Sequence, residues 1–320
     1  MSGELTLEEL VQVQAHFGLP SPALVEKDFY VVKALAAIAA VELESLHVRL
    51  VFGGGTALSR AHRLIRRMSE DIDLRIVVDS YRPGRGTLRR LRARITEALL
   101  GAGFKFDPED PAYRKTGNET RYTIYRLPYE PAAVGEGALR PTIQIETAVW
   151  PLYRPAVELP VISFVAEALE RPPEVAKIEC VSILETAADK FVALTRRAGA
   201  ELAGLVAEPD PTLVRHLHDL HALREHYDPP EVAALAREIM LADAAAYGSQ
   251  FPAYREDPLR ETHRAIEGLA IDAGYARQYG DFRRFMVYGG DAEYAVCIGT
   301  LKELAQQFKN DPEIARDRNS

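Results

Sequence analysis

The clearest alternation of apolar and polar positions lies in residues 69–78. Asp71 and Asp73 alternate there with aliphatic residues at every second position from 72 to 76. In a β-strand this places the aliphatic side chains on one face and both carboxylates on the other. An apolar run at residues 50–52 predicts a second strand, and it leads into three consecutive glycines. The sequence therefore predicts two strands and a glycine turn at the centre of the fold.

The remaining elements follow from caps, helical period and turn residues. Thr6 and Glu9 form a capping box that opens a first helix. Ser21 before Pro22 marks the start of a second helix, because proline suits the first helical position. Further along, the pattern predicts a helix over residues 87–100, a loop over 103–120, strands over 121–127 and 142–149, and a proline-rich connection over 151–173.

This order of elements predicts an α/β domain with a small mixed sheet over residues 1–175 and an all-helical domain over residues 176–320. The chain has 320 residues, of which 47% are apolar, enough for a substantial core. The N-terminus has no charged-then-apolar signal segment, and no apolar run reaches membrane-spanning length. We therefore expect a globular cytoplasmic protein with no membrane partner.

Soft metal ligands do not form a pattern in this sequence. Cys180 and Cys297 lie far apart without metal-ligand spacing, and we expect both to be buried free thiols. Four histidines lie between residues 216 and 226, but no partnering pattern of carboxylate and histidine accompanies them. The sequence therefore gives little support to a zinc site.

The glycine turn and the two aspartates together predict chemistry. Glycines followed by Thr56 make a turn whose N–H groups a phosphate can approach closely, with Gly54, Gly55 and Thr56 as candidate nucleotide contacts. Asp71 and Asp73 place two like charges side by side, which a cation between them would stabilise. Mg²⁺, or Mn²⁺, is the expected cofactor, because such ions bind one or two carboxylates plus substrate phosphates. These residues predict transfer of a nucleotidyl or phosphoryl group.

Arginines are concentrated in one stretch of an acidic chain. The formal net charge of −8 argues against general affinity for nucleic acid, yet six arginines lie between positions 82 and 94. Helical period points the leucines of this stretch inward and the arginines outward. The arginine face is either solvated and paired with neighbouring acids or a track for an RNA backbone. The candidate RNA contacts are Arg66, Arg67, Arg85, Arg89, Arg90, Arg92 and Arg94.

Two blocks of the sequence resemble the signature of a known family. Gly54-Gly55-Thr56-Ala57-Leu58, a spacer with Arg67, and Ser69-Glu70-Asp71-Ile72-Asp73-Leu74 are similar to motifs of the AbiEii-type nucleotidyltransferase toxins, which include the MenT toxins. The resemblance implies a polymerase-beta-like nucleotidyltransferase core followed by an all-helical C-terminal lobe. It also implies a cytosolic bacterial toxin that a cognate antitoxin neutralises.

The resemblance also suggests site residues outside these blocks. Lys190 corresponds to a family lysine that faces the nucleotide, where an ammonium offsets charge that builds on the leaving pyrophosphate. Asp219 corresponds to a family aspartate that could hold this lysine or orient the acceptor. Polymerase-like nucleotidyltransferases take a third metal ligand from a neighbouring strand, and Glu146 is the candidate by order and alternation. Ser69 is a further candidate phosphate contact.

A charged run, Glu26-Lys27-Asp28, opens the second helix and is similar to a run that the family has ahead of its glycine strand. Acidic residues in a first turn suit the helix dipole, so we expect a solvated helix start. A contact from Lys27 to phosphate or RNA is the alternative.

The resemblance implies a function for the whole chain. A nucleotide would pass from an NTP, such as ATP, to the 3′ end of tRNA with release of pyrophosphate, which would block aminoacylation and translation. The catalytic candidates are Asp71, Asp73, Lys190 and Asp219. Two alternatives stay open. One is a nucleotidyltransferase that modifies a hydroxyl of a protein or small molecule, and the other is a non-enzymatic module that binds a nucleotide or the antitoxin.

Overall fold

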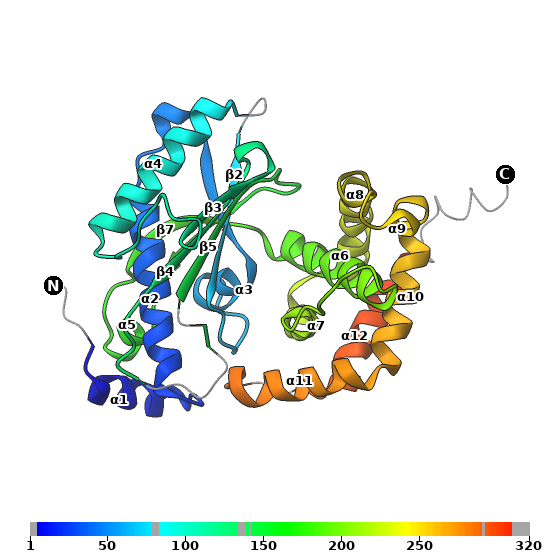
Figure 1. The fold of residues 1–320 in the computed structure, drawn as a ribbon. Coiled ribbons are helices and arrows are strands. Elements are labelled where there is room, and N and C mark those ends of the chain that lie inside the picture. Colours follow the sequence, from blue (N-terminus) through cyan, green and yellow to red (C-terminus); the bar gives the residue numbers. More distant parts are fainter. Residues whose placement is uncertain (1–4, 79–82, 134–138, 141, 290–291, 309–320) are drawn as a thin grey trace. The chain divides into compact units, whose positions relative to one another are not determined.

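The computed structural model describes residues 5–78, 83–133, 139–140, 142–289 and 292–308. The chain forms two compact units (Figure 1). Unit 1 comprises residues 1–181 and 286–289, and unit 2 comprises residues 182–285 and 290–320.

Unit 1 contains a mixed sheet in which the described strands follow the order β3-β4-β5-β2-β1-β7-β6. β2 is parallel to β5, and β1 is parallel to β7, whereas the other neighbouring strands are antiparallel. The elements are α1 (Leu7–Phe17), α2 (Pro22–Ala39), β1 (Arg49–Gly53), α3 (Gly54–Thr56), β2 (Asp71–Val77), α4 (Arg85–Gly101), β3 (Arg114–Gly117), β4 (Tyr122–Pro128), β5 (Thr142–Val149), β6 (Val157–Val161), α5 (Phe164–Ala168) and β7 (Val175–Cys180).

β2 lies at the centre of this sheet, and one of its faces is aliphatic. Ile72, Leu74 and Ile76 are buried in one core with residues of α2 and α4, including Leu35 and Leu91. These two helices cover that face of the sheet (Figure 1). Burial of each such side chain contributes about 1.5–3 kcal/mol to stability. The intervening positions of the strand hold the two aspartates, so the predicted alternation is present.

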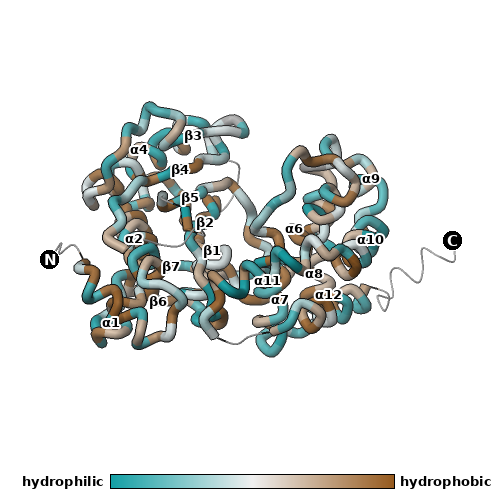
Figure 2. Tube along the Cα trace, turned by 60° about the horizontal axis from the view of Figure 1, so that its bottom comes forward, coloured by the Kyte–Doolittle hydropathy of each residue, from teal (hydrophilic) through white to brown (hydrophobic). Residues whose placement is uncertain are grey.

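Unit 2 has helices and no strand among its described residues. α6 is central, because α7, α8 and α10 all pack against it. Hydrophobic and hydrophilic positions alternate along these helices (Figure 2). No helix in the described ranges is both long and apolar enough to cross a membrane. The helices are α6 (Ile183–Leu202), α7 (Leu213–Ala222), α8 (Pro229–Tyr247), α9 (Pro252–Glu256), α10 (Pro258–Ile271), α11 (Ala273–Met286) and α12 (Tyr294–Gln307).

Several local predictions are confirmed. The side chains of Thr6 and Glu9 form the reciprocal capping box at the start of α1. Ser21 accepts a hydrogen bond from a main-chain N–H of the first turn of α2. Cys180 and Cys297 are both buried thiols, and neither is in a disulfide. These features depend on short stretches of sequence, which is why the pattern alone was sufficient to find them.

Two segments differ from the sequence prediction. Residues 151–173, predicted as a connection, contribute strand β6 and helix α5. Residues 103–120, predicted as a loop, contain β3. Both strands lie at edges of the sheet and are largely exposed, so they lack the apolar alternation of a buried strand. Edge strands also tolerate proline, and β6 contains Pro160.

The division into units also differs from a single boundary near residue 175. β7 pairs with β1 inside the sheet, so unit 1 continues to residue 181. Residues 286–289, which begin at the last residue of α11, also belong to unit 1. There the N–H of Met68 donates to the carbonyl of Met286 at 2.7 Å. This return of the chain depends on tertiary pairing and has no local sequence signal.

Candidate active site

The glycine turn follows β1 directly and fits closely against the carboxylate of Asp73. Gly54 has a φ of +71°, in the left-handed region that L side chains rarely adopt. A Cβ added at Gly54 would overlap Oδ2 of Asp73 and lie 2.8 Å from its Cγ. Glycine at this position therefore allows the main chain of the turn to lie against the carboxylate.

The next residue of the turn faces a guanidinium and a hydroxyl. A Cβ added at Gly55 would overlap the guanidinium of Arg67 and lie 2.7 Å from Oγ of Ser69. Arg67 is buried and donates a hydrogen bond to the carbonyl of Met68 at 2.9 Å. Arg67 was predicted as an RNA contact, but its guanidinium lies beside the turn instead of on the open surface.

Thr56 is the third predicted nucleotide contact, and it is buried. Its hydroxyl donates a hydrogen bond to the main-chain carbonyl of Asp71. This bond ties the residue after the glycines to the first residue of β2. The structure therefore gives Thr56 a contact that positions Asp71.

Glu146 lies on β5 opposite Asp73 of β2. Its carboxylate accepts a hydrogen bond from the side chain of Gln144 at 2.8 Å. Among the residues that the structure describes, no three or more Asp, Glu, His or Cys side chains are arranged as a metal site. The register thus places Glu146 next to the aspartate pair without assembling a three-carboxylate cluster.

The charged run at the start of α2 is buried, so the expectation of a solvated helix start is wrong. Glu26, Lys27 and Asp28 are each at most 3% exposed. Asp28 lies 3.1 Å from Nε of Arg60 and accepts the N–H of Phe164 at 2.7 Å. Burial raises the pKa of Asp28 to about 6, and the nearby guanidinium opposes that rise. The helix start is therefore packed inside unit 1, because tertiary partners compensate its charges.

Lys27 has three partners within unit 1. Its ammonium lies 3.3 Å from the carboxylate of Glu70, the residue before Asp71. It also donates to the carbonyls of Arg140 and Thr142 at 2.6 and 2.7 Å. An ammonium has three protons to donate, so these three contacts use its whole capacity to donate hydrogen bonds. A contact from Lys27 to phosphate or RNA is inconsistent with this arrangement.

Arg140 is the site residue that sequence reasoning missed. Its Nη2 donates to Oδ1 of Asp71 at 2.6 Å, and its Nε lies 3.5 Å from Oε1 of Glu70. It comes just before β5, after a stretch of prolines and glycines that has no chemical motif. Arg140 becomes apparent only in the structure, where the buried Lys27 binds its main-chain carbonyl.

In unit 2 the structure brings together Lys190 of α6 and Asp219 of α7. Nζ of Lys190 lies 2.7 Å from Oδ2 of Asp219, and the two side chains are 7% and 0% exposed. Nδ1 of His218 lies 3.4 Å from the other oxygen of the carboxylate. Two residues that are distant in sequence thus form one buried ion pair across two packed helices.

Comparison with known proteins decides the family. The family model described as "Nucleotidyl transferase AbiEii toxin, Type IV TA system" matches residues 36–307. The chain belongs to the AbiEii nucleotidyltransferase toxin family. No curated protein matches the sequence significantly.

Among solved structures, this AbiEii chain is similar to MenT4, a nucleotidyltransferase toxin from Mycobacterium tuberculosis H37Rv. The TM-score is 0.51 with 19% sequence identity, over 95% of this chain and 99% of MenT4. At this identity the likeness shows the fold alone. The fold is thus a mixed sheet with surrounding helices and a helical C-terminal region, like that of a MenT toxin.

The AbiEii core of this chain has oxygen donors that fit a divalent metal ion. Asp71 and Asp73 come from one face of β2, and the side chain of Asp71 is 27% exposed. A cationic group, the guanidinium of Arg140, already lies at Asp71. Magnesium usually binds one or two carboxylates and takes its remaining oxygens from water and phosphates. Asp71 and Asp73 match this donor set, and the register places Glu146 opposite Asp73.

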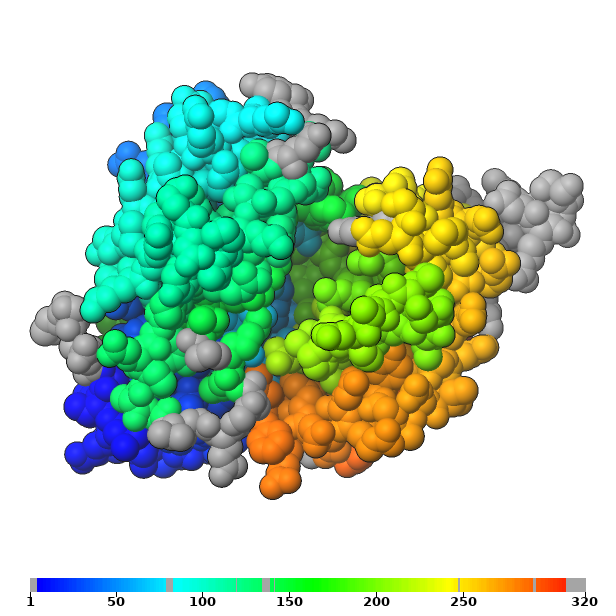
Figure 3. Space-filling view, viewed as in Figure 1, coloured from blue at the N-terminus to red at the C-terminus, as the bar shows by residue number. Residues whose placement is uncertain are grey.

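The predicted RNA track of this AbiEii protein divides into exposed and anchored arginines. α4 lies on the face of unit 1 shown in Figure 3. Arg92 donates to a main-chain carbonyl of a neighbouring segment, and Arg94 does the same and also bonds a serine hydroxyl. Arg67 is buried. The candidates that remain exposed are Arg66, Arg85, Arg89 and Arg90.

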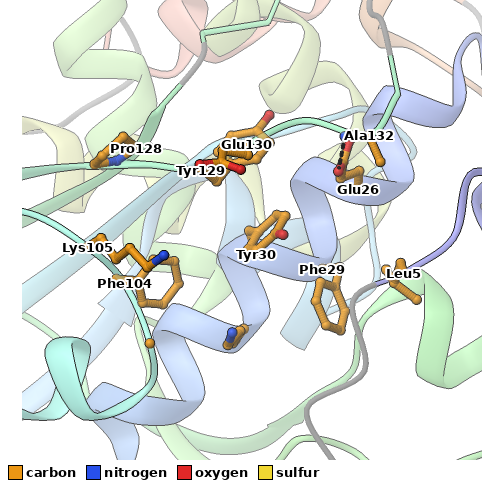
Figure 4. Close-up of a pocket in the computed structure, with 12 residues that line it drawn as sticks. Leu5, Glu26, Phe29, Tyr30, Phe104, Lys105, Pro128, Tyr129, Glu130 and Ala132 are labelled. Atoms are coloured by element: carbon orange, nitrogen blue, oxygen red, sulfur yellow. Dashed lines mark hydrogen bonds between the residues drawn. The ribbon is translucent and has the colours of Figure 1, made fainter.

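A separate cavity of about 510 Å³ opens beside α2 (Figure 4). The rings of Tyr30 and Tyr129 line it with their centroids 4.8 Å apart. Nζ of Lys33 lies 5.5 Å from the centroid of Phe104 in the same cavity. The described lining includes none of the predicted site residues. Tyr129 follows β4 and Phe104 follows α4, so these contacts pack α2 against both segments.

Proposed function

We propose that this chain is a metal-dependent toxin that transfers a nucleotide from an NTP to the 3′ end of tRNA. The acceptor hydroxyl would attack the α-phosphorus, and the bond to pyrophosphate would break. A tRNA blocked at its 3′ end could not be aminoacylated, so translation would stop. Aminoacylation takes place in the cytoplasm, where we expect the toxin to act and a cognate antitoxin protein to neutralise it. Membership of the AbiEii family supports this proposal.

One structural observation carries the proposal. The glycine turn lies against the carboxylate of Asp73, and a Cβ at Gly54 would occupy that carboxylate's place. N–H groups that can bind phosphate are thus adjacent to carboxylates that can bind metal. This adjacency is what a nucleotidyltransferase requires, because the metal and the N–H groups act on the same triphosphate.

In unit 1, Asp71 and Asp73 would hold Mg²⁺ or Mn²⁺. The bound ion would neutralise phosphate charge and polarise the reacting phosphoryl group. The N–H groups of Gly54 and Gly55 and the hydroxyl of Ser69 would orient the phosphates. Thr56 would keep β2 in position through its bond to the main chain of the first aspartate.

In unit 2, Lys190 would stabilise charge on the leaving pyrophosphate. Within the described part of the chain, Asp219 is the single ion-pair partner of its ammonium. An ammonium has three protons to donate, so capacity is left for phosphate oxygens. Asp219 is fully buried and would act by holding Lys190 in place.

Incubation of the purified protein with total tRNA, Mg²⁺ and each labelled NTP in turn tests the proposal. We expect label on tRNA with at least one NTP, and Asp71→Ala should reduce it by more than about a hundredfold. A thermal melt of the variant checks that it folds. Full turnover in Asp71→Ala would refute the metal assignment.

The same experiment separates the alternatives. Label on the protein itself or on added small hydroxyl compounds, with none on tRNA, would favour the first alternative. No label with any NTP, together with a melting temperature unchanged by Mg²⁺ and NTP, would favour a non-enzymatic module that binds the antitoxin and no nucleotide.

A further inference from the structure

Buried groups fix Arg140 beside Asp71 by both its main chain and its side chain. The N–H of Arg140 donates to Oε2 of Glu70 at 3.1 Å, and its carbonyl accepts from Lys27 at 2.6 Å. Its guanidinium then lies 2.6 Å from Oδ1 of Asp71. Glu70 is 2% exposed and Lys27 is 0% exposed. The guanidinium therefore occupies a defined position instead of sampling the surface.

Two consecutive residues of α2 hold the segment that contains Arg140. The two carboxylate oxygens of Glu26 accept the N–H groups of Ala132 and Ala133 at 2.7 and 3.0 Å, and Figure 4 shows the first of these bonds. Lys27 binds the carbonyls on either side of residue 141. The described ends of the connection from β4 to β5 are thus both fastened to α2. Glu26 and Lys27 of the charged run therefore have a structural role, which is to place Arg140.

Two cations and two carboxylates of this cluster face each other, and Arg140 lies closer to Asp71 than to Glu70. Glu70 is compensated by Lys27, with which it is buried. Arg140 lies at ion-pair distance from Asp71, and among the described residues it is the single cation at that distance from this carboxylate. Arg140 therefore supplies at Asp71 the positive charge that a metal ion would supply. A divalent ion bound at Oδ1 would repel the guanidinium and compete for the same oxygen.

We propose that Arg140 is a phosphate-binding residue that exchanges partners. In the ligand-free protein it is the counter-ion of Asp71, and when metal occupies Asp71 it binds the triphosphate. This inference rests on the proposed function. A guanidinium suits both partners, because its fork of N–H groups matches carboxylate and phosphate oxygens alike. The side chain is 37% exposed, so it can turn without unfolding the buried cluster.

The test compares Arg140→Ala, Arg140→Lys and the control Arg49→Ala. Arg49 is similarly exposed, at 41%, and also forms an ion pair in unit 1, with Glu179 at 2.7 Å. Mn²⁺ binding without nucleotide is measured by electron paramagnetic resonance. Binding of the α,β-methylene analogues of ATP, CTP, GTP and UTP with Mg²⁺ is measured by calorimetry, because these analogues cannot transfer a nucleotide. Thermal melts verify that each variant is folded.

The exchange predicts opposite signs for the two measurements. Arg140→Ala should bind Mn²⁺ several-fold more tightly, because no guanidinium has to leave Asp71. It should bind the analogue about ten- to a hundredfold more weakly, the usual cost of a lost hydrogen bond to a charged group. Arg140→Lys should fall between the alanine variant and the wild type, and Arg49→Ala should match the wild type.

Unchanged analogue affinity in Arg140→Ala would overturn the inference while leaving the proposed function intact, and so would weaker Mn²⁺ binding. Failure of the wild type to bind any analogue with Mg²⁺ would instead overturn the proposed function. In that case the Mn²⁺ measurement would still show whether Arg140 is the counter-ion of Asp71.

Discussion

The two units each contain a lysine that is buried against a carboxylate, and the two lysines differ in how many partners they have. Lys27 of α2 lies near Glu70 and donates to two main-chain carbonyls. Lys190 of α6 lies 2.7 Å from Asp219, the sole ion-pair partner given by the described residues. The first ammonium has used its donors on the protein, whereas the described residues occupy only part of the donor capacity of the second.

This difference shows how to separate a structural charge from a functional one. Burial and a carboxylate partner are common to both lysines, so neither feature is diagnostic. The count of donors that the protein leaves unused is diagnostic, because a group that binds substrate needs spare hydrogen-bonding capacity. By this criterion we expect Lys27 to maintain the site and Lys190 to bind the ligand.

Removal of Lys27 gives the sharpest test on the structural side. Lys27→Met should lower the free energy of unfolding of unit 1 by about 3–5 kcal/mol, because buried Glu70 would lose the ammonium at 3.3 Å and keep the half-exposed guanidinium of Arg140. Lys33→Met on the same helix is the control, and the loss of its contact with aromatic rings should cost about 1 kcal/mol. Thermal and urea unfolding measure both. Equal effects of the two substitutions would contradict the structural role of Lys27.

Removal of Lys190 tests the functional side. Lys190→Ala should lower kcat by about 10²–10³, the range for loss of one group that stabilises transition-state charge. Its effect on unfolding should be smaller than that of Lys27→Met, because Asp219 retains the neighbouring ring of His218. Single-turnover kinetics and melts of the same samples decide the point. Normal turnover of Lys190→Ala together with a large loss of stability would show that Lys190 has a structural role, like Lys27.

A substitution at Gly54 is expected to affect both the stability of unit 1 and the binding of a metal ion. Gly54→Ala should cost about 1–2 kcal/mol, because its φ of +71° disfavours a side chain. It should also abolish tight Mn²⁺ binding, because the new Cβ would displace the carboxylate of Asp73. Gly86→Ala in α4 is the matched control, since a Cβ there meets nothing within 4 Å. Normal Mn²⁺ affinity in Gly54→Ala would show that the close fit of the turn is unimportant.

The smallest expected effect concerns the exposed arginines of α4. Arg89→Ala with Arg90→Ala should weaken RNA binding several-fold and lower the slope of log affinity against log salt by nearly two. Arg94→Ala is the comparison, because this arginine is bonded to a neighbouring carbonyl and a serine. Filter binding at several salt concentrations gives the slopes. A slope unaffected by the double substitution would exclude the track.

The sequence was informative wherever the signal is local. The alternation around Asp71 and Asp73, the three glycines and the helix caps each depend on a few adjacent residues, and each has the predicted structure. The family signature lies in the same stretches, and the family match covers them. The nearness of Lys190 and Asp219 was suggested by the resemblance, and the packing of α6 on α7 provides it.

Tertiary structure decided the rest, for one physical reason. The sequence alone determined that two carboxylates share a face next to a glycine turn, because strand geometry and glycine conformation are local properties. It could not determine that Glu26-Lys27-Asp28 is buried, since the cost of burying a charge depends on partners such as Glu70 and Arg60 that lie elsewhere in the chain. The same holds for Arg140 and for residues 286–289, whose positions result from pairing between distant segments.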